Sequence, residues 1–172
     1  MHADSSASEG SQTEPVPTGD EPPEPFHLQT PAGFVPADQK WLSDHLEQLQ
    51  GHLPREVEQI NIRLLDDTGM SQLHQQWKGL EGPTDVLSWF HSSGDQPLEA
   101  DLAVGYEVAA REAALRRHPV RQEILLYIVH GILHGCGFDD LVPEAAARMH
   151  AEEDRILALL GVEATYTREA SE

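Results

Sequence analysis

The chain has 172 residues, of which 39% are hydrophobic, with a formal net charge of −19 and one cysteine. This length suits a single domain with its own core and is too short for two ordinary domains. The negative charge argues against a general nucleic-acid coat, which needs a basic face. A single cysteine excludes a disulfide within the chain and indicates a reducing compartment, so we expect a cytoplasmic protein.

Membrane insertion and secretion are not expected from the sequence. No apolar run reaches the length needed to span a bilayer, and the N-terminus lacks a basic patch followed by an apolar segment. The basic residues are unevenly distributed, with none in residues 1–39 and seven of the eleven within residues 55–121. A local phosphate-binding patch is therefore compatible with the acidic composition.

The N-terminal segment, residues 1–24, is rich in Ser, Glu, Pro and Gly and has almost no large apolar residue. Such a composition cannot bury enough surface to offset its ordering entropy, so we expect a disordered acidic tail. A single folded domain is predicted over residues 25–165, followed by a short C-terminal tail over 166–172.

Within this domain the hydrophobic periodicity predicts strands that come first and helices that cluster late. Strands are expected at 26–28, 57–65, 86–90 and 101–104, and helices at 38–50, 68–78, 105–117, 120–134 and from 143 onward. Thr68 is the expected cap of the second helix, with Met70, Leu73 and Trp77 facing inward. The order of the elements favours an α+β fold, in which a small mixed β-sheet packs on about five helices.

Helix 120–134 is apolar on nearly every side, which predicts the central buried helix of the domain. His130 and His134 lie four residues apart on it, so both side chains share one face. Two imidazoles placed in this way can bind one zinc ion, although the spacing alone is a weak signal, because two helical histidines with backbone or water partners would look the same. A histidine in an apolar helix needs a polar partner, and this context strengthens the metal interpretation.

The glycine-rich turn after His134 returns the chain toward the two histidines and brings in Asp139 and Asp140. A carboxylate from this turn can supply a third ligand and leave the fourth position to water, which is the catalytic arrangement of zinc. We therefore predict a metal site at the end of the central helix. Gly131 stands where HExxH metalloproteases carry their general base, so ordinary metalloprotease chemistry is not expected.

Several segments together resemble the YbeY family of endoribonucleases, also called rRNA maturation factors. The segment from His130 to Asp140, HGILHGCGFDD, is similar to the family signature HGxLHLxGYDH. Residues 84–89 (TDVLSW) resemble the family's TDVLSF strand, residues 73–78 (LHQQWK) its LNxxYR segment, and residues 100–102 (ADL) its GDI strand start. The blocks occur in the family's order over about residues 57–161.

This resemblance implies a zinc-dependent endoribonuclease that acts on single-stranded ribosomal RNA, in maturation of the small ribosomal subunit and in ribosome quality control. It implies one zinc ion per chain, held by His130, His134 and Asp140. Lys78 would stabilise phosphate charge, and Asp139 and Ser88 would be supporting catalytic residues at the cleft. No membrane or DNA partner is expected, and no Glu or His has an obvious role as general base.

Three positions depart from the family pattern. The family has a His at the position of Asp140, a Leu at Gly135 and an Arg at Lys78. An aspartate keeps the third donor but adds negative charge, which makes the metal a weaker Lewis acid. Lysine keeps the positive charge but loses the bidentate geometry with which arginine binds phosphate.

Other residues near these motifs have a functional and a structural interpretation. Cys136 is close enough to be a metal ligand, but a small buried residue is the favoured interpretation. His150 could approach the site from the last helix, and a surface or packing role is favoured. Four arginines, Arg111, Arg116, Arg117 and Arg121, could bind RNA phosphates or form a solvated helix face.

Two rival functions remain open from the sequence. The first is a non-catalytic, ribosome-associated binding factor in which a structural metal fixes the turn to the helix. The second is a metal hydrolase with another substrate. An open coordination position in a cleft would favour catalysis, whereas a fourth protein ligand would favour a structural site.

Overall fold

The computed structural model describes residues 23–163, so nearly all of the two predicted tails lies outside the described residues. It contains a mixed four-stranded sheet and five α-helices, which confirms the predicted α+β fold. The strands are β1 (Phe26–Gln29), β2 (Val57–Leu65), β3 (Val86–Phe90) and β4 (Leu98–Gly105). The helices are α1 (Pro36–Leu49), α2 (Asp67–Lys78), α3 (Tyr106–Arg116), α4 (Val120–Gly135) and α5 (Pro143–Leu159), and a short 3-10 turn follows α1 (Gln50–His52).

The sheet has the strand order β1-β2-β4-β3. β1, β2 and β4 run parallel, and β3 pairs antiparallel with β4, so that Ser88 lies opposite Leu102. β3 is thus an edge strand, and it carries the last four residues of the TDVLSW segment along one side of the sheet.

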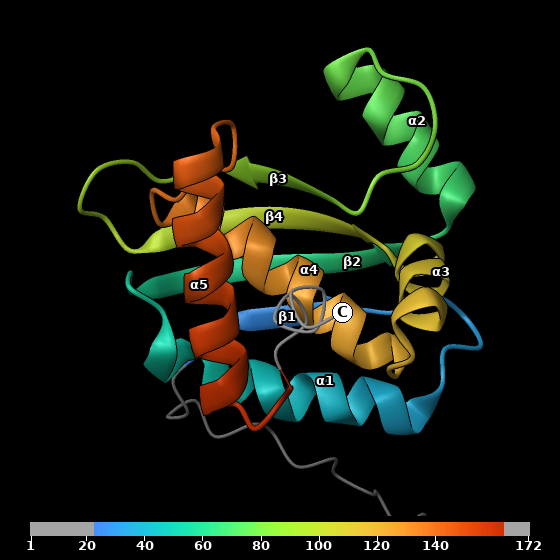
Figure 1. The fold of residues 1–172 in the computed structure, drawn as a ribbon, viewed down its shortest axis with the longest axis horizontal. Helices are drawn as coiled ribbons and strands as arrows, with labels where there is room; N and C mark the ends of the chain where they lie inside the picture. The colour runs from blue at the N-terminus through green and yellow to red at the C-terminus, as the bar shows by residue number, and fades with distance from the viewer. Residues whose placement is uncertain (1–22, 164–172) are drawn as a thin grey trace, which may run out of the picture.

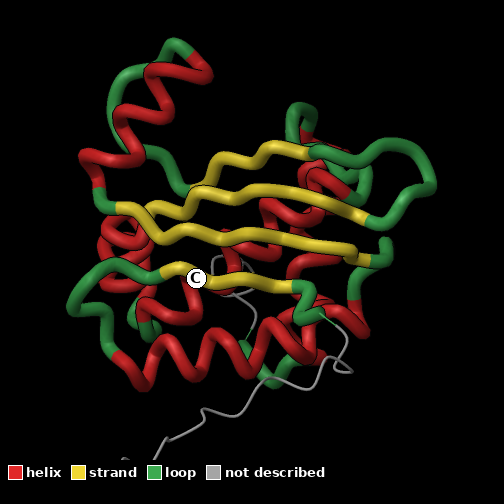
Figure 2. The backbone as a smooth tube through the Cα atoms, turned by 180° about the vertical axis from the view of Figure 1, so that it is seen from behind, coloured by secondary structure: helices red, strands yellow, loops and turns green. Residues whose placement is uncertain are grey.

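Four of the helices cover one face of this sheet. Figure 1 shows α4 crossing in front of the strands, with α5 and α3 at its two ends and α1 beneath it. Seen from behind, the strands lie in front of these helices, and α2 extends outward beyond the β3 edge (Figure 2). No helix of residues 23–163 is both long and apolar enough to cross a membrane.

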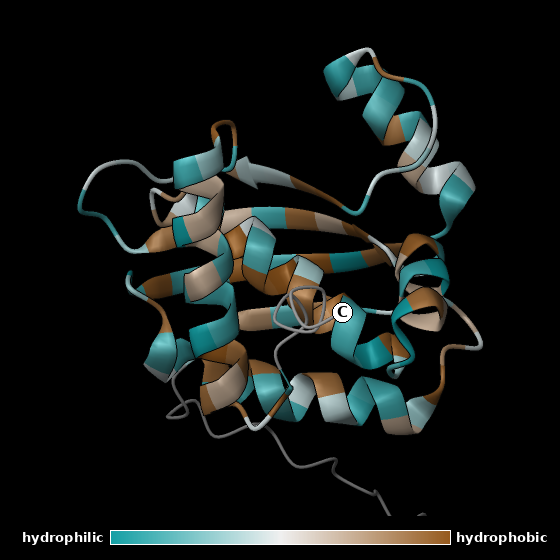
Figure 3. Ribbon diagram, in the orientation of Figure 1, coloured by the Kyte–Doolittle hydropathy of each residue, from teal (hydrophilic) through white to brown (hydrophobic). Residues whose placement is uncertain are grey.

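The alternating pattern of β2 explains why one sheet face is covered. Ile60, Ile62 and Leu64 are buried in the core, whereas Asn61 between the first two is half-buried and Arg63 between the last two is exposed. This period of two places apolar side chains against the helices and polar side chains on the other face. Brown, hydrophobic segments accordingly alternate with teal ones along the strands behind the helices, and hydrophilic colours dominate the projecting α2 (Figure 3).

Helix α4 is the central element, as its apolar sequence predicts, and its residues from Glu123 to Val129 are all buried. Gly131 allows it to lie directly on the sheet, because a Cβ there would come within 2.9 Å of both Leu102 Cδ2 and Ser88 Oγ. Gly135 also allows close contact with the sheet, because a Cβ there would lie 2.6 Å from Phe90 Cε1. The ring of Phe90 thus occupies the space that a larger residue at position 135 would need.

Two expectations about α2 are wrong. The helix is capped by Asp66, whose Oδ1 accepts a hydrogen bond from Gly69 N at 2.8 Å, and Thr68 lies inside its first turn. Trp77 is 57% exposed because the end of α2 extends past the sheet, and only Met70 of the three predicted inward residues is fully buried. The helical period of α2 is confirmed, but no pattern in the sequence indicates that the sheet ends beneath this helix.

Candidate metal centre

The last two turns of α4 bring His130 and His134 together, as their spacing predicts. Their Nε2 atoms lie 3.2 Å apart, and the two rings are nearly perpendicular. His130 is the more buried of the pair, with 15% of its side chain exposed against 31% for His134. Both rings therefore present the same nitrogen to one point at the end of the helix.

The other nitrogen of each ring faces an oxygen acceptor. His130 Nδ1 lies 2.6 Å from Glu153 Oε1 on α5, and His134 Nδ1 lies 3.2 Å from the carbonyl oxygen of Phe138. A carboxylate and a carbonyl can only accept hydrogen bonds, so both Nδ1 atoms act as donors. This leaves both Nε2 atoms available as ligands, which is the tautomer that an Nε2-bound metal requires.

The turn after α4 contributes Asp140 to the same point. Asp140 Oδ2 lies 3.4 Å from His130 Nε2, and its Oδ1 lies 3.8 Å from His134 Nε2. Ligand atoms of these three residues all lie within 4.8 Å of one another, and they form the one such group found among the described residues. Neither Cys136 nor Asp139 belongs to this group.

The donor set fits a zinc ion on its chemistry and spacing. Two imidazole nitrogens bound to a tetrahedral zinc at about 2.0–2.1 Å lie roughly 3.3 Å from each other. The 3.2 Å between the Nε2 atoms is close to this value. Two neutral rings with Nδ1–H would also point lone pairs at each other here, so a cation or a shared proton is needed between them.

The charges around His130 favour a cation at this position. Burial disfavours the protonated ring, but the hydrogen bond and the negative charge of Glu153, with further contributions from Asp85 and Asp140, outweigh it and raise the pKa of His130. The same carboxylates that stabilise a proton on the ring would stabilise a metal ion beside it.

A cleft of about 390 Å³ opens next to the two histidines. Its walls come from the end of α2, the residues that enter and form β3, and the end of α4. The lining residues are Lys78, Asp85, Val86, Leu87, Ser88, Phe90, His130 and His134.

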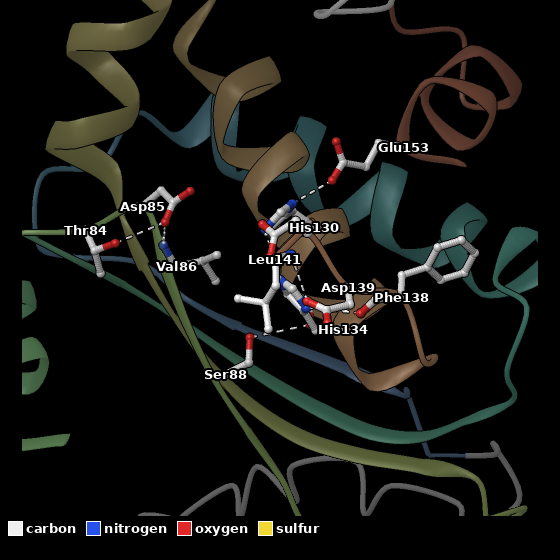
Figure 4. A network of polar contacts seen from close by, with 12 residues as sticks. Thr84, Asp85, Val86, Ser88, His130, His134, Phe138, Asp139, Leu141 and Glu153 are labelled. Carbon is white, nitrogen blue, oxygen red and sulfur yellow. Dashed lines mark hydrogen bonds and ion pairs between the residues drawn. The ribbon is translucent and has the colours of Figure 1, made fainter. Parts of the chain in front are cut away.

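Two of the predicted catalytic residues thus line this cleft with the histidines. Lys78 is exposed, and no partner is recorded for its ammonium group among the described residues. Ser88 donates to the carbonyl oxygen of Gly131 at 3.4 Å, which points its side chain toward α4 (Figure 4).

The third predicted catalytic residue, Asp139, does not line the cleft. Its Oδ1 accepts a hydrogen bond from Leu141 N at 3.1 Å, an arrangement that supports the turn carrying Asp140. A role for Asp139 in the reaction remains a prediction.

Cys136 and His150 stand outside the group of ligand atoms. Cys136 is partly buried beside the core, and this burial raises the pKa of its thiol to about 11. That environment suits the interpretation as a small packing residue. His150 is partly buried on α5.

Three of the four arginines in the predicted cluster form ion pairs with neighbouring carboxylates. Arg111 pairs with Asp67 at 2.7 Å, and Arg121 lies 3.4 Å from Asp38 and over the ring of Trp41. Arg116 pairs with Glu112 and with the buried Glu123. These contacts favour the structural interpretation of the cluster over phosphate binding.

Two residues that support the site were missed from the sequence. Glu153 is fully buried behind His130, and Arg55 donates to the carbonyl oxygen of Gly135 at the end of α4 from Nη1 at 2.8 Å. Glu153 could have been found, because it continues the buried stripe of α5 four residues after Met149 and a charge in such a stripe needs a partner. No sequence signal pointed to Arg55, which lies 80 residues away from Gly135.

Comparisons with known proteins show which family the sequence resembles. The sequence model of the family described as Endoribonuclease YbeY matches residues 34–161. A protein of Methylocella silvestris named Endoribonuclease YbeY is 36% identical over 124 residues, which span 70% of this chain and 69% of the relative. A protein of Roseiflexus sp. with the same name is 33% identical and is matched over 76% of its length. A chloroplastic endoribonuclease YBEY of Arabidopsis thaliana is also 33% identical, but the chain spans only 22% of it.

The fold also matches a solved structure. A solution structure of a protein from Thermotoga maritima superposes with a TM-score of 0.53 and covers 78% of this chain and 90% of its own. The two sequences are 19% identical, so this likeness concerns the fold alone.

Proposed function

The chain belongs to the YbeY family of endoribonucleases, and from this premise we propose that it is a zinc-dependent hydrolase that cleaves single-stranded RNA. We further propose ribosomal RNA of the small subunit as its substrate, with roles in maturation and ribosome quality control in the cytoplasm. One zinc ion per chain would be held by His130, His134 and Asp140.

The observation that carries this proposal is the meeting of two Nε2 atoms and one carboxylate beside a cleft that Lys78 also lines. Three protein ligands leave a coordination position open, as in catalytic zinc sites, whereas structural sites have four. This number of donors favours catalysis over the structural-metal alternative.

Zinc bound there would supply a Lewis acid for hydrolysis of a phosphodiester bond. The chain's own residues would perform the other tasks. Lys78 would attract the phosphate and stabilise the charge that develops on it. Ser88 and Asp139 would support the cleft, Ser88 through its contact with Gly131 and Asp139 through the turn that carries Asp140.

Asp85 is a candidate for the missing general base. It lines the cleft, and its Oδ1 accepts hydrogen bonds from Val86 N at 2.7 Å and from Thr84 Oγ1 at 3.1 Å. Those bonds fix the carboxyl group, and its Oδ2 has no hydrogen-bond partner among residues 23–163. A carboxylate held in this way could take a proton from an attacking water molecule.

The test combines metal analysis with an RNA cleavage assay. Protein purified without chelator should contain about one zinc per chain and cleave single-stranded RNA, and His130→Ala should lose both properties. A metal-free wild-type protein would overturn the zinc site. A zinc-loaded protein that binds ribosomal RNA and cleaves none would favour the non-catalytic binding factor, and cleavage of other substrates alone would favour a different hydrolase.

A further inference from the structure

Glu153 is one of two fully buried charged side chains among the described residues. Its Oε1 contacts His130 Nδ1 at 2.6 Å from α5, on the opposite side of the ring from the β3 residues that line the cleft (Figure 4). Because the side chain is 0% exposed, it cannot touch a substrate in the cleft. Glu153 can therefore affect a reaction in the cleft only through His130, which it contacts.

The surroundings of Glu153 do not supply the hydrogen bonds that a purely structural buried carboxylate would need. Its second oxygen, Oε2, is buried and has no hydrogen-bond partner among the described residues. Burying a carboxylate is costly unless it is paired and hydrogen-bonded, and an apolar side chain usually serves helix packing as well or better. The contact with His130 is therefore the interaction that compensates for this burial.

The other buried glutamate shows what a structural pair looks like in the same fold. Glu123 contacts His118 Nε2 through one oxygen and Arg116 Nη1 through the other. Both of its oxygens are thus matched, one of them by a permanent cation. Glu153 contacts only a histidine, whose other nitrogen, Nε2, points at the candidate metal position.

We propose that Glu153 is a positioning residue, which holds His130 in the Nδ1–H tautomer and directs its Nε2 toward the metal. The proposal rests on the proposed function only in taking a metal ion as the group that Nε2 binds. Carboxylates behind metal-binding histidines fix the ring orientation and increase its basicity, and their loss typically lowers metal affinity about 10–100-fold.

The variant Glu153→Gln separates positioning from packing because it keeps the shape and removes the charge. A carboxamide lacks the negative charge that makes the ring more basic. Its oxygen can still accept from Nδ1–H, whereas its N–H, if it donates to Nδ1, places the ring proton on Nε2, the nitrogen that the metal needs. Metal affinity should therefore fall more than stability. Glu152→Gln is the matched control, since it removes one negative charge from the adjacent position, where Glu152 pairs with Arg155.

The experiment measures zinc affinity by competition with a chromogenic chelator in wild type, Glu153→Gln and Glu152→Gln, at a temperature where all three are folded without metal. We expect Glu153→Gln to bind zinc about 10–100-fold more weakly and Glu152→Gln to change affinity less than about twofold. Cobalt-substituted Glu153→Gln should also show an altered visible spectrum. Unchanged affinity with lowered thermal stability would overturn the proposal in favour of a packing role.

A second measurement needs neither a variant nor a metal. Long-range ¹H–¹⁵N NMR of metal-free wild type, at a pH where the ring is neutral, should show His130 protonated on Nδ1. A proton on Nε2 would overturn the proposal even if Glu153→Gln fails to fold. If wild type binds no zinc, the proposed function fails while this tautomer still decides the role of Glu153, so the two failures are distinguishable.

Discussion

His130 and His134 point their Nε2 atoms at each other across 3.2 Å, while their Nδ1 atoms are engaged by Glu153 and by the carbonyl of Phe138. Neither ring can turn its lone pair away without breaking the contact at its other nitrogen. The arrangement thus keeps two nitrogen atoms that could bind a metal directed at one point. Such preorganisation reduces the entropic cost of assembling a metal site.

Gly131→Ala should destabilise the protein and disturb the cleft. The new Cβ would meet Leu102 Cδ2 and Ser88 Oγ at 2.9 Å, so α4 would have to move away from the strands. Overpacking of this kind costs about 1–3 kcal/mol of unfolding free energy. Chemical denaturation measures the loss, and Gly51→Ala is the control, because a Cβ at position 51 has no neighbour within 4 Å. Equal stability of the two variants would show that the helix does not lie this close to the sheet.

Cys136 should react slowly with thiol reagents in the folded protein. With its pKa raised to about 11 by burial, roughly one thiol in a thousand is ionised at pH 8, against about a quarter for an ordinary cysteine. A higher pKa makes each thiolate more nucleophilic, which offsets part of this difference. We expect a rate at least about tenfold below that of the denatured protein, measured by absorbance with a chromogenic disulfide. A rate equal to the denatured one would mean that the thiol is not buried.

The same shift predicts how stability depends on pH. A folded-state pKa above the ordinary value means that the unfolded chain releases this proton first as pH rises. The contribution of Cys136 to stability is thus fully present below about pH 8.5 and is lost as pH rises toward about 11. Cys136→Ala should lack this part of the decline in denaturation experiments across that range.

Local patterns in the sequence predicted most of the fold. The helical period placed α4 and its histidine pair, and the alternation of β2 placed its buried face. What could not be predicted depends on contacts between distant segments. The contact of Arg55 with Gly135 requires the start of β2 to lie near the end of α4, and the exposure of Trp77 depends on where the sheet ends.

The candidate metal site likewise combines features that local sequence predicts with features that only the folded structure shows. Spacing brought His130 and His134 to one helix face, and the glycine turn brought an aspartate to them. Spacing alone could not choose between Asp139 and Asp140, since both follow the same turn. The geometry distinguishes them, because Asp140 reaches both Nε2 atoms and Asp139 accepts from the backbone of Leu141.

Lys78→Ala should lower kcat/KM for RNA cleavage by about 10–100-fold, the range expected for loss of a charged hydrogen bond of about 1.5–3 kcal/mol. Zinc content should not change, because Lys78 lines the cleft without belonging to the ligand group. Lys78→Arg should retain activity, since a guanidinium can bind phosphate through two nitrogens. Lys40→Ala on α1, where the lysine pairs with Asp44, is the control. Full activity of Lys78→Ala in steady-state kinetics would exclude this role.

The neighbouring aspartates give the most discriminating prediction. Asp140→Ala should weaken zinc binding strongly, because only two protein ligands would remain. Asp139→Ala should keep its zinc and lose only the hydrogen bond to Leu141 N, which stabilises the turn modestly. Zinc content after dialysis against a weak chelator measures both outcomes. An empty site in Asp139→Ala together with a full one in Asp140→Ala would assign the ligand to the other residue.

Asp140→His extends this test from metal binding to chemistry. The variant restores three imidazole donors and removes a negative charge from beside the metal, which should make the metal a stronger Lewis acid. Water at such a site loses its proton at lower pH, so the acidic limb of the pH–rate profile for single-stranded RNA cleavage should move to lower pH than in wild type. Zinc content should stay near one per chain. If the variant keeps its zinc and its profile does not move, Asp140 does not control the acidity of the reacting group, and its role is limited to holding the metal.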